Sequence, residues 1–283
     1  MGGWTLVGVP LYTIAGYRGM GEAPTALRRG GLGRAVDVSD DLGDVALPEL
    51  KEDAVEGRVK NLGHFRESTS AAYGALKSVD AERVMVLGGE CSETVGVMAG
   101  LAGSFGGKAG MLWMDAHGDF NTPATSRSGF IGGMCLAMAA GRGPWLLPGA
   151  PPLAEERLVH VGSRALDPPE AEAFRSSPAT VVSSRQVKSG GASDAAEAVR
   201  RLGDGSDWVA CHLDLDAVDP ELIGAVNYPE PGGLSLEETS AVIRALMKTG
   251  KVRAVEVAAY NPLLDRDGAS LRSIMRLLKA AFG

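Results

Sequence analysis

The sequence is poor in cysteine. Only Cys91, Cys135 and Cys211 occur in 283 residues. They form no C-x-x-C pair, and if two were bridged the third would be left over. A disulfide framework is therefore not expected. Reduced thiols fit the cytoplasm, which we take as the expected location.

Long apolar runs and an excess of basic residues are also missing. No run approaches the about 20 apolar residues that a membrane span needs, and residues 1–10 lack the basic and apolar segments of a secretion signal. The 28 Lys and Arg residues are outnumbered by 35 Asp and Glu residues, and the formal net charge is −7. Non-specific nucleic-acid binding requires a basic surface. We therefore expect a small-molecule partner, with no nucleic acid and no membrane.

Apolar residues make up 45% of the chain, which is enough for a large core, and we expect residues 1–283 to form a single domain. Short apolar runs recur along the sequence, and most are followed by a segment with helical features. This alternation predicts an α/β fold, a three-layer α/β/α sandwich with a central parallel sheet. The predicted strands are residues 4–9, 83–87, 110–114, 158–161, 208–213 and 252–257.

Helix signals mark three further segments. Pro24 lies in the first turn of a predicted helix at 23–29, and Ser235 with Glu238 forms a capping box that opens a helix at 236–248. An amphipathic helix is predicted over 271–282. Residues 141–152 and 217–233, rich in glycine and proline or in turn-forming residues, are predicted loops.

The segment Asp115-Ala116-His117-Gly118-Asp119 follows a predicted strand directly. Two carboxylates and an imidazole at a strand end suit a divalent cation, because ligands of open α/β sheets bind at the strand ends. The alternative is a capped turn that carries one surface histidine, and this segment alone does not decide between them.

A second acidic pair, Asp214 and Asp216, follows another apolar strand. Residues two apart lie on the same side of an extended chain, and a carboxylate on an apolar strand is costly without a cationic partner. A metal would satisfy both acids, whereas the alternative is that they turn outward to solvent. We interpret His212, two residues earlier, as a packed strand histidine rather than a ligand.

Taken together, the two segments hold more ligands than one cation needs, and they predict a site for two metals. A third strand ends in Gly88-Gly89-Glu90-Cys91, where a tight turn could bring the Cys91 thiol to the same crevice. A coordinating thiol binds as thiolate. The alternative is a buried cysteine that acts as a small apolar residue.

These motifs resemble those of the ureohydrolase family, which includes arginases and agmatinases, and the resemblance extends from the first strand to about Asp265. It implies an arginase-like fold, homo-oligomers, and two manganese ions per chain that activate a water molecule. It also implies a histidine ligand where this chain has Cys91. The metal ligands implied by the resemblance are Cys91, Asp115, His117, Asp119, Asp214 and Asp216.

The resemblance also implies roles around the substrate. Asn121 and Ser128 match the loop that holds the carboxylate of an amino acid, and Asp167 matches the acid that meets its ammonium group. Glu256 matches the carboxylate that pairs with the guanidinium, and Asp119 would orient the water and pass its proton to the leaving nitrogen. Each residue has an alternative as a turn former or a strand-end acid.

Two departures from the family bear on the substrate. The family's proton-shuttling histidine aligns with Gly132, and a threonine of its pocket aligns with Tyr228. With Cys91, the missing imidazole resembles family members that hydrolyse Nω-hydroxy-L-arginine to L-ornithine and hydroxyurea in D-cycloserine biosynthesis. The sequence therefore predicts a binuclear-metal amidinohydrolase of this specificity. Arginase, agmatinase or other guanidino-acid hydrolase activity, and a non-catalytic amino acid sensor, stay open as alternatives.

Overall fold

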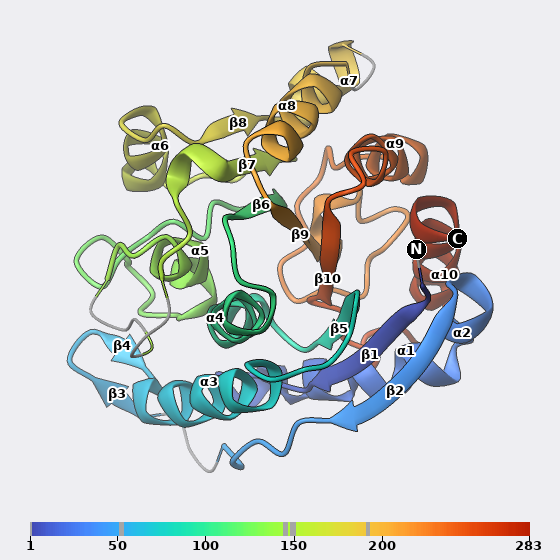
Figure 1. The fold of residues 1–283 in the computed structure, drawn as a ribbon. Coiled ribbons are helices and arrows are strands. Elements are labelled where there is room, and N and C mark those ends of the chain that lie inside the picture. The colour runs from blue at the N-terminus through green and yellow to red at the C-terminus, as the bar shows by residue number, and fades with distance from the viewer. Residues whose placement is uncertain (1, 51–53, 144–146, 148–150, 191–192) are drawn as a thin grey trace.

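The computed structural model describes residues 2–50, 54–143, 147, 151–190 and 193–283. Its centre is an eight-stranded sheet in the order β2-β1-β5-β10-β9-β6-β7-β8, and every neighbouring pair is parallel (Figure 1). The strands are β1 (Trp4–Val9), β2 (Val38–Asp44), β5 (Val84–Gly88), β6 (Ala109–Met114), β7 (Leu158–Val161), β8 (Thr180–Val182), β9 (Trp208–Asp214) and β10 (Val252–Ala258). A small antiparallel hairpin is formed by β3 (Val55–Glu56) and β4 (Val59–Lys60).

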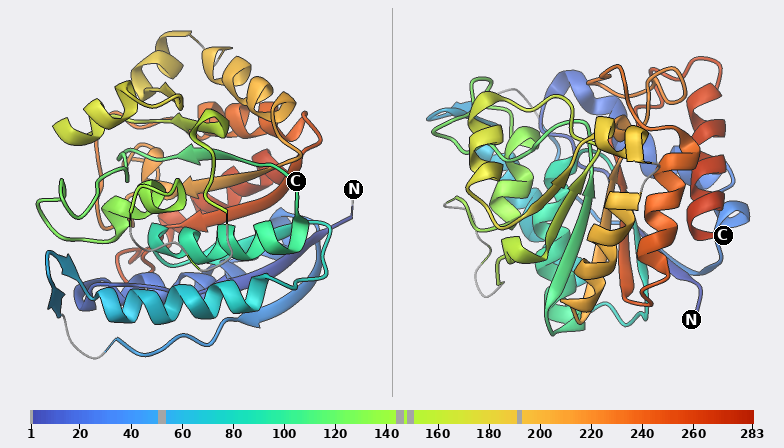
Figure 2. Two further views of the ribbon diagram at one scale, coloured as in Figure 1. Left: turned by 60° about the vertical axis from the view of Figure 1, so that its left-hand side comes forward. Right: turned by 90° about the horizontal axis from the view of Figure 1, so that it is seen from above.

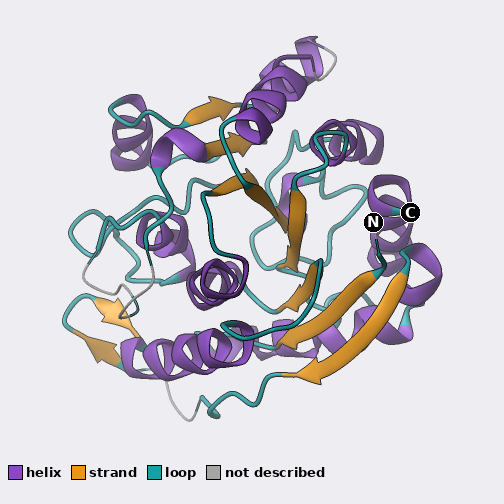
Figure 3. Ribbon diagram, in the orientation of Figure 1, coloured by secondary structure: helices purple, strands orange, loops and turns teal. Residues whose placement is uncertain are grey.

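Helices cover both faces of the sheet, so the expected three-layer α/β/α sandwich is confirmed (Figures 1, 2 and 3). The core of one face includes side chains of α3 (Leu62–Leu76), α4 (Thr94–Phe105), α5 (Cys135–Ala139) and α6 (Pro168–Arg175). The other core includes side chains of α1 (Ala23–Arg29), α2 (Leu32–Ala35), α7 (Ser184–Gly190), α8 (Ser193–Asp204), α9 (Leu236–Met247) and α10 (Ala269–Phe282). Short 3-10 helices are η1 (Ala15–Glu22), η2 (Cys91–Glu93), η3 (Gly132–Met134), η4 (Glu155–Arg157) and η5 (Leu215–Ala217).

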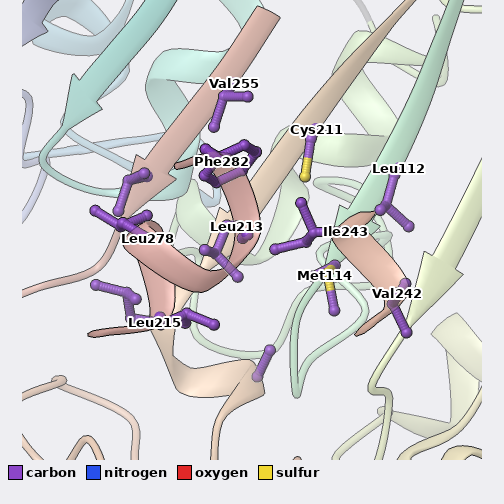
Figure 4. Close-up of a cluster of buried hydrophobic side chains, with 14 of the residues drawn as sticks. Leu112, Met114, Cys211, Leu213, Leu215, Val242, Ile243, Val255, Leu278 and Phe282 are labelled. Carbon is purple, nitrogen blue, oxygen red and sulfur yellow. The ribbon is translucent and has the colours of Figure 1, made fainter. Parts of the chain in front are cut away.

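Alternation along the central strands assigns each side chain to one of these cores. Leu112 of β6 and Leu213 of β9 pack in one cluster with Ile243 of α9 and Leu278 of α10, all fully buried (Figure 4). Each such side chain contributes on the order of 1.5–3 kcal/mol when it leaves water. The alternate side chains of β6 and β9, which point away from Leu112 and Leu213, face α4 and α5. The polar site forms on that side of the sheet.

The six predicted strands are confirmed to within one or two residues, and so are the helices at 23–29, 236–248 and 271–282. The two edge strands were not predicted, because β2 is mostly exposed and polar and β8 is only three residues long. After Ala217, which ends η5, the predicted loop at 217–233 contains no helix or strand. Of the predicted loop at 141–152, residues 144–146 and 148–150 lie outside the described residues.

Candidate active site

A cavity lies where the carboxyl ends of β5, β6, β9 and β10 meet. These strands are adjacent, in the order β5-β10-β9-β6, so segments far apart in sequence converge at one edge of the sheet. All six metal ligands implied by the resemblance line this cavity: Cys91, Asp115, His117, Asp119, Asp214 and Asp216. The convergence expected from the sequence is therefore present in the structure.

The loop after β6 is folded around Asp115, which is almost fully buried. Its Oδ2 accepts a hydrogen bond from Trp113 Nε1 at 3.0 Å, and its Oδ1 accepts one from the backbone N–H of His117 at 2.7 Å. Both carboxylate oxygens are thus held from within the same segment. The carboxylate has one fixed orientation at the floor of the cavity.

The loop after β9 is fixed in the same way and is joined to the first. Asp214 Oδ1 accepts from the backbone N–H of Asp216 at 2.7 Å, and Asp216 Oδ1 accepts from the backbone N–H of Ala116 at 3.0 Å. His117 Nδ1 lies 2.9 Å from Asp216 Oδ2. The two acidic motifs therefore form one hydrogen-bonded unit, although about a hundred residues separate them.

Cys91, at the start of η2, adds a sulfur atom to this unit. Its buried thiol donates to Asp214 Oδ2 at 2.8 Å. Among the described residues, two groups have potential ligand atoms within 4.8 Å of one another, as the atoms around one ion would be. They are Cys91, Asp115, His212 and Asp214 in one group, and Asp115, His117 and Asp216 in the other.

The negative charges of this cluster would be stabilised by bound cations. Burial and the neighbouring carboxylates raise the pKa values of Asp115, Asp119 and Asp214, because like charges are crowded away from water. Burial alone would lower the pKa of His117, but hydrogen bonds to Asp115 and Asp216 raise it to about 12. Divalent ions would neutralise the buried acids and bind the imidazole in its neutral form. The donor set therefore fits two metal ions that share Asp115.

Asp119 also lines the cavity but belongs to neither of the two groups found in the described part of the chain. It has a left-handed φ of 49°, and the Cys135 thiol lies 3.4 Å from its Oδ2. Sequence reasoning did not assign Cys135 to the site. Because Cys135 is sixteen residues further on, across an irregular loop, no local pattern could have shown the contact.

The residues proposed for the amino acid end of a substrate lie in the same cavity. Asn121, Ser128 and Asp167 all line it, and Asn121 Nδ2 donates to Asp167 Oδ2 at 3.1 Å. Glu170 connects their two loops, because its carboxylate accepts from the backbone N–H groups of Phe120 and Asp167, each at 2.9 Å. The structure thus brings these three side chains together, next to the acidic cluster.

Glu256 lies in β10, beside His212. Its side chain is buried within β10 and contacts His212 and Thr94, and it is not part of the cavity lining. Ala259, one residue beyond the end of β10, lines the cavity instead and has a φ of 69°. The role of Glu256 as a guanidinium partner stays a prediction.

The two departures from the family lie at the cavity as well. A Cβ atom on Gly132 would lie 2.5 Å from ring atoms of Phe130, so this ring fills the space that a larger side chain at 132 would occupy. Tyr228 hydrogen-bonds Tyr17 through their hydroxyl groups, and its ring lies 5.8 Å from that of Phe130. Aromatic rings thus stand at the cavity where the resemblance implies an imidazole and a threonine.

Buried carboxylates, an imidazole and a thiol at the carboxyl edge of a parallel sheet define a metal-dependent α/β protein with ligands for two ions. The Arginase family model matches residues 3–283, so the chain belongs to the Arginase family. Members of this family are binuclear manganese enzymes that hydrolyse guanidino or amidino groups, and this chain is a hydrolase of that kind. Expectations of a hydrolase with a two-metal centre are confirmed.

Individual relatives are arginases. The chain is 30% identical to an arginase of Bacillus subtilis (strain 168), covering 99% of this chain and 97% of that protein. It is 31% identical to an arginase of Brevibacillus brevis, with coverage of 99% and 97%. The structure of arginase from Bacillus caldovelox matches with a TM-score of 0.92 at 30% identity, covering 100% of this chain and 99% of that one. Within the described residues, no helix has the length and apolar character needed to cross a membrane.

Removal of metal should lower thermal stability. Without cations the folded cluster holds protons at carboxyls whose pKa values are raised, so its stability falls as pH rises from the ordinary pKa of Asp to these raised values. Metal at about a hundred times its Kd adds about 2.7 kcal/mol, or about 5–10 °C in Tm. Scanning calorimetry at pH 7.5 with and without a chelator measures this difference. An unchanged Tm would contradict metal binding by the cluster.

Proposed function

We propose that this chain hydrolyses Nω-hydroxy-L-arginine to L-ornithine and hydroxyurea. The observation that supports the proposal is that the Phe130 ring, in its present rotamer, occupies the space beside Gly132 that an imidazole at that position would take. A hydroxyl group on the guanidino nitrogen withdraws electrons, so the group is less basic and its carbon is more easily attacked. Such a substrate depends less on a proton-shuttling histidine than arginine does.

Recognition of the amino acid end would fall to the loops after β6 and β7. Asn121 and Ser128 would hold the α-carboxylate, and Asp167 would accept a hydrogen bond from the α-ammonium. The contact between Asn121 and Asp167 and the double anchor of Glu170 support this, because they fix both loops before a substrate arrives. Tyr228, next to Phe130, would restrict the side of the cavity near the guanidino group.

The proposed reaction breaks the bond between the guanidino carbon and the δ-nitrogen of the ornithine part. When bound, the two manganese ions supply a hydroxide nucleophile near neutral pH. The hydroxide adds to the carbon of the protonated hydroxyguanidinium group, so the adduct is neutral. Asp119 would orient the attacking oxygen, take its remaining proton and pass it to the δ-nitrogen as the carbon–nitrogen bond breaks. The products are neutral hydroxyurea and L-ornithine, whose freed amine takes up the proton released when the water became hydroxide.

Product identification tests the substrate. The manganese-loaded enzyme is given Nω-hydroxy-L-arginine, L-arginine or agmatine at equal concentration, and hydroxyurea, urea and L-ornithine are separated by chromatography. We expect kcat/KM for the hydroxylated substrate to exceed that for arginine by about 10²-fold, the lower range of one acid–base group. Faster urea release from arginine would overturn the proposal in favour of an arginase. Preference for agmatine, which has no carboxylate, would contradict the roles of Asn121 and Ser128.

A further inference from the structure

A row of polar side chains lies directly beneath the acidic cluster, within the sheet. The strand register pairs Trp113 of β6 with His212 of β9, and His212 with Glu256 of β10. Asp115 directly follows β6 and Asp214 ends β9, each two residues further along the chain and on the same side as Trp113 and His212. His212 is therefore one step below Asp214, between an indole and a carboxylate.

The imidazole of His212 is fully buried and held on three sides. Its ring stacks on that of Trp113, with centroids 3.7 Å apart and an angle of 12° between the planes. Its Nδ1 lies 2.6 Å from Glu256 Oε2 and 3.1 Å from Thr94 Oγ1. These contacts fix the ring but use only one of its two nitrogens.

The other nitrogen, Nε2, has no hydrogen-bond partner among the described residues, although it is buried. A buried polar atom without a partner is costly and calls for an explanation, such as an ion that the protein binds. A ring nitrogen of His212 lies within 4.8 Å of potential ligand atoms of Cys91, Asp115 and Asp214. Four donor atoms at such separations can surround a single ion at bond distances of about 2.0–2.3 Å.

We infer that His212 is a ligand of the ion beside Cys91, and that Glu256 positions it. Metal-binding histidines commonly donate their second ring N–H to a carboxylate, which fixes the tautomer and raises the basicity of the coordinating nitrogen. Glu256 has this relation to His212: it accepts from Nδ1–H and leaves the Nε2 lone pair for the metal. The inference adds metal binding to the packing role expected of His212, and it does not depend on which guanidino compound is the substrate.

The inference gives the two ions different surroundings. The ion beside Cys91 would have sulfur, nitrogen and carboxylate ligands, a set that suits zinc or cobalt better than an oxygen-rich set does. The second ion would be bound by His117 and the carboxylates of Asp115 and Asp216. Cobalt(II) is therefore a suitable spectroscopic probe of the first ion.

The first test is a crystal structure of the wild-type protein loaded with cobalt, with the ions located by anomalous scattering. We expect His212 Nε2 at about 2.0–2.2 Å from the ion beside Cys91. A distance above about 3 Å, with the ion present, would overturn the inference. This measurement needs no variant, so it cannot be confused with a failure to fold.

The second test measures metal affinity in variants by equilibrium dialysis against cobalt, with absorption spectra as an independent readout. His212→Ser should lower the affinity for the ion beside Cys91 by at least about 100-fold and reduce the intensity of the visible bands of bound cobalt. Glu256→Gln should lower this affinity by about 10–100-fold. His64→Ser is the matched control, because this histidine bonds the carbonyl of Tyr12, does not line the cavity, and should leave both ions in place. Unchanged affinity and spectrum in folded His212→Ser would overturn the inference.

Discussion

Replacing Asp119 by asparagine should reduce kcat by about 10²- to 10⁴-fold, the effect expected for the loss of one acid–base group. Asparagine has nearly the same shape, so the contact with Cys135 and the left-handed backbone at this position can persist. The amide cannot take a proton from the attacking water or pass one to the leaving nitrogen. The loss should therefore appear in kcat more than in KM.

Because the resemblance also makes Asp119 a metal ligand, the metal content of this variant has to be measured beside its activity. Asp219→Asn is a matched control, since Asp219 lies in the loop after η5, is partly exposed, and does not line the cavity. The control should keep full activity. Wild-type kcat in Asp119→Asn with both ions bound would remove Asp119 from the proposed mechanism.

The second large effect concerns arginine as a substrate. A double variant, Phe130→Ala with Gly132→His, should raise the rate of urea release from L-arginine by about 10²-fold over the wild type. Removal of the ring creates space for the new imidazole, which can then shuttle protons at the place where the family has its histidine. Gly132→His alone should gain less activity than the double variant, because its Cβ would lie 2.5 Å from atoms of the Phe130 ring in the present rotamer.

Phe130→Ala by itself is the control for the wider cavity and should not increase arginine hydrolysis. The wild type, the two single variants and the double variant form a thermodynamic cycle. For each of them kcat/KM for arginine and the thermal unfolding temperature are measured, and the differences give the coupling between the two positions. If Gly132→His alone were as active as the double variant and equally stable, the ring would not be what excludes an imidazole.

Much of this architecture was predictable because its signals are local. Apolar runs of strand length followed by helical segments imply parallel strands, and parallel strands place their carboxyl ends at one edge of a sheet. Asp115 and His117 on one strand end and Asp214 and Asp216 on another were therefore expected at the same edge, and the strand order makes them neighbours because β6 lies beside β9. The structure adds that backbone N–H groups and His117 connect the two pairs directly.

What could not be predicted depends on register and rotamers. The pairing of Glu256 with His212 across β9 and β10 is set by the strand register, and it brings the carboxylate to the His212 ring. The same register leaves His212 Nε2 without a partner among the described residues, for which the sequence offers no sign. The packing of Phe130 against Gly132 is a rotamer choice in an irregular loop, so the alignment showed a missing histidine but not what fills its place.

The binding of two ions by this one cavity can be measured directly. The purified protein is dialysed against manganese, freed of excess metal, and its manganese and protein contents are determined by mass spectrometry and amino acid analysis. Two ions per chain are expected for the wild type, and no more than one for Asp216→Ala, which removes a ligand of the second group. One ion or fewer in the folded wild type at saturating manganese would contradict the two-metal centre and the chemistry built on it.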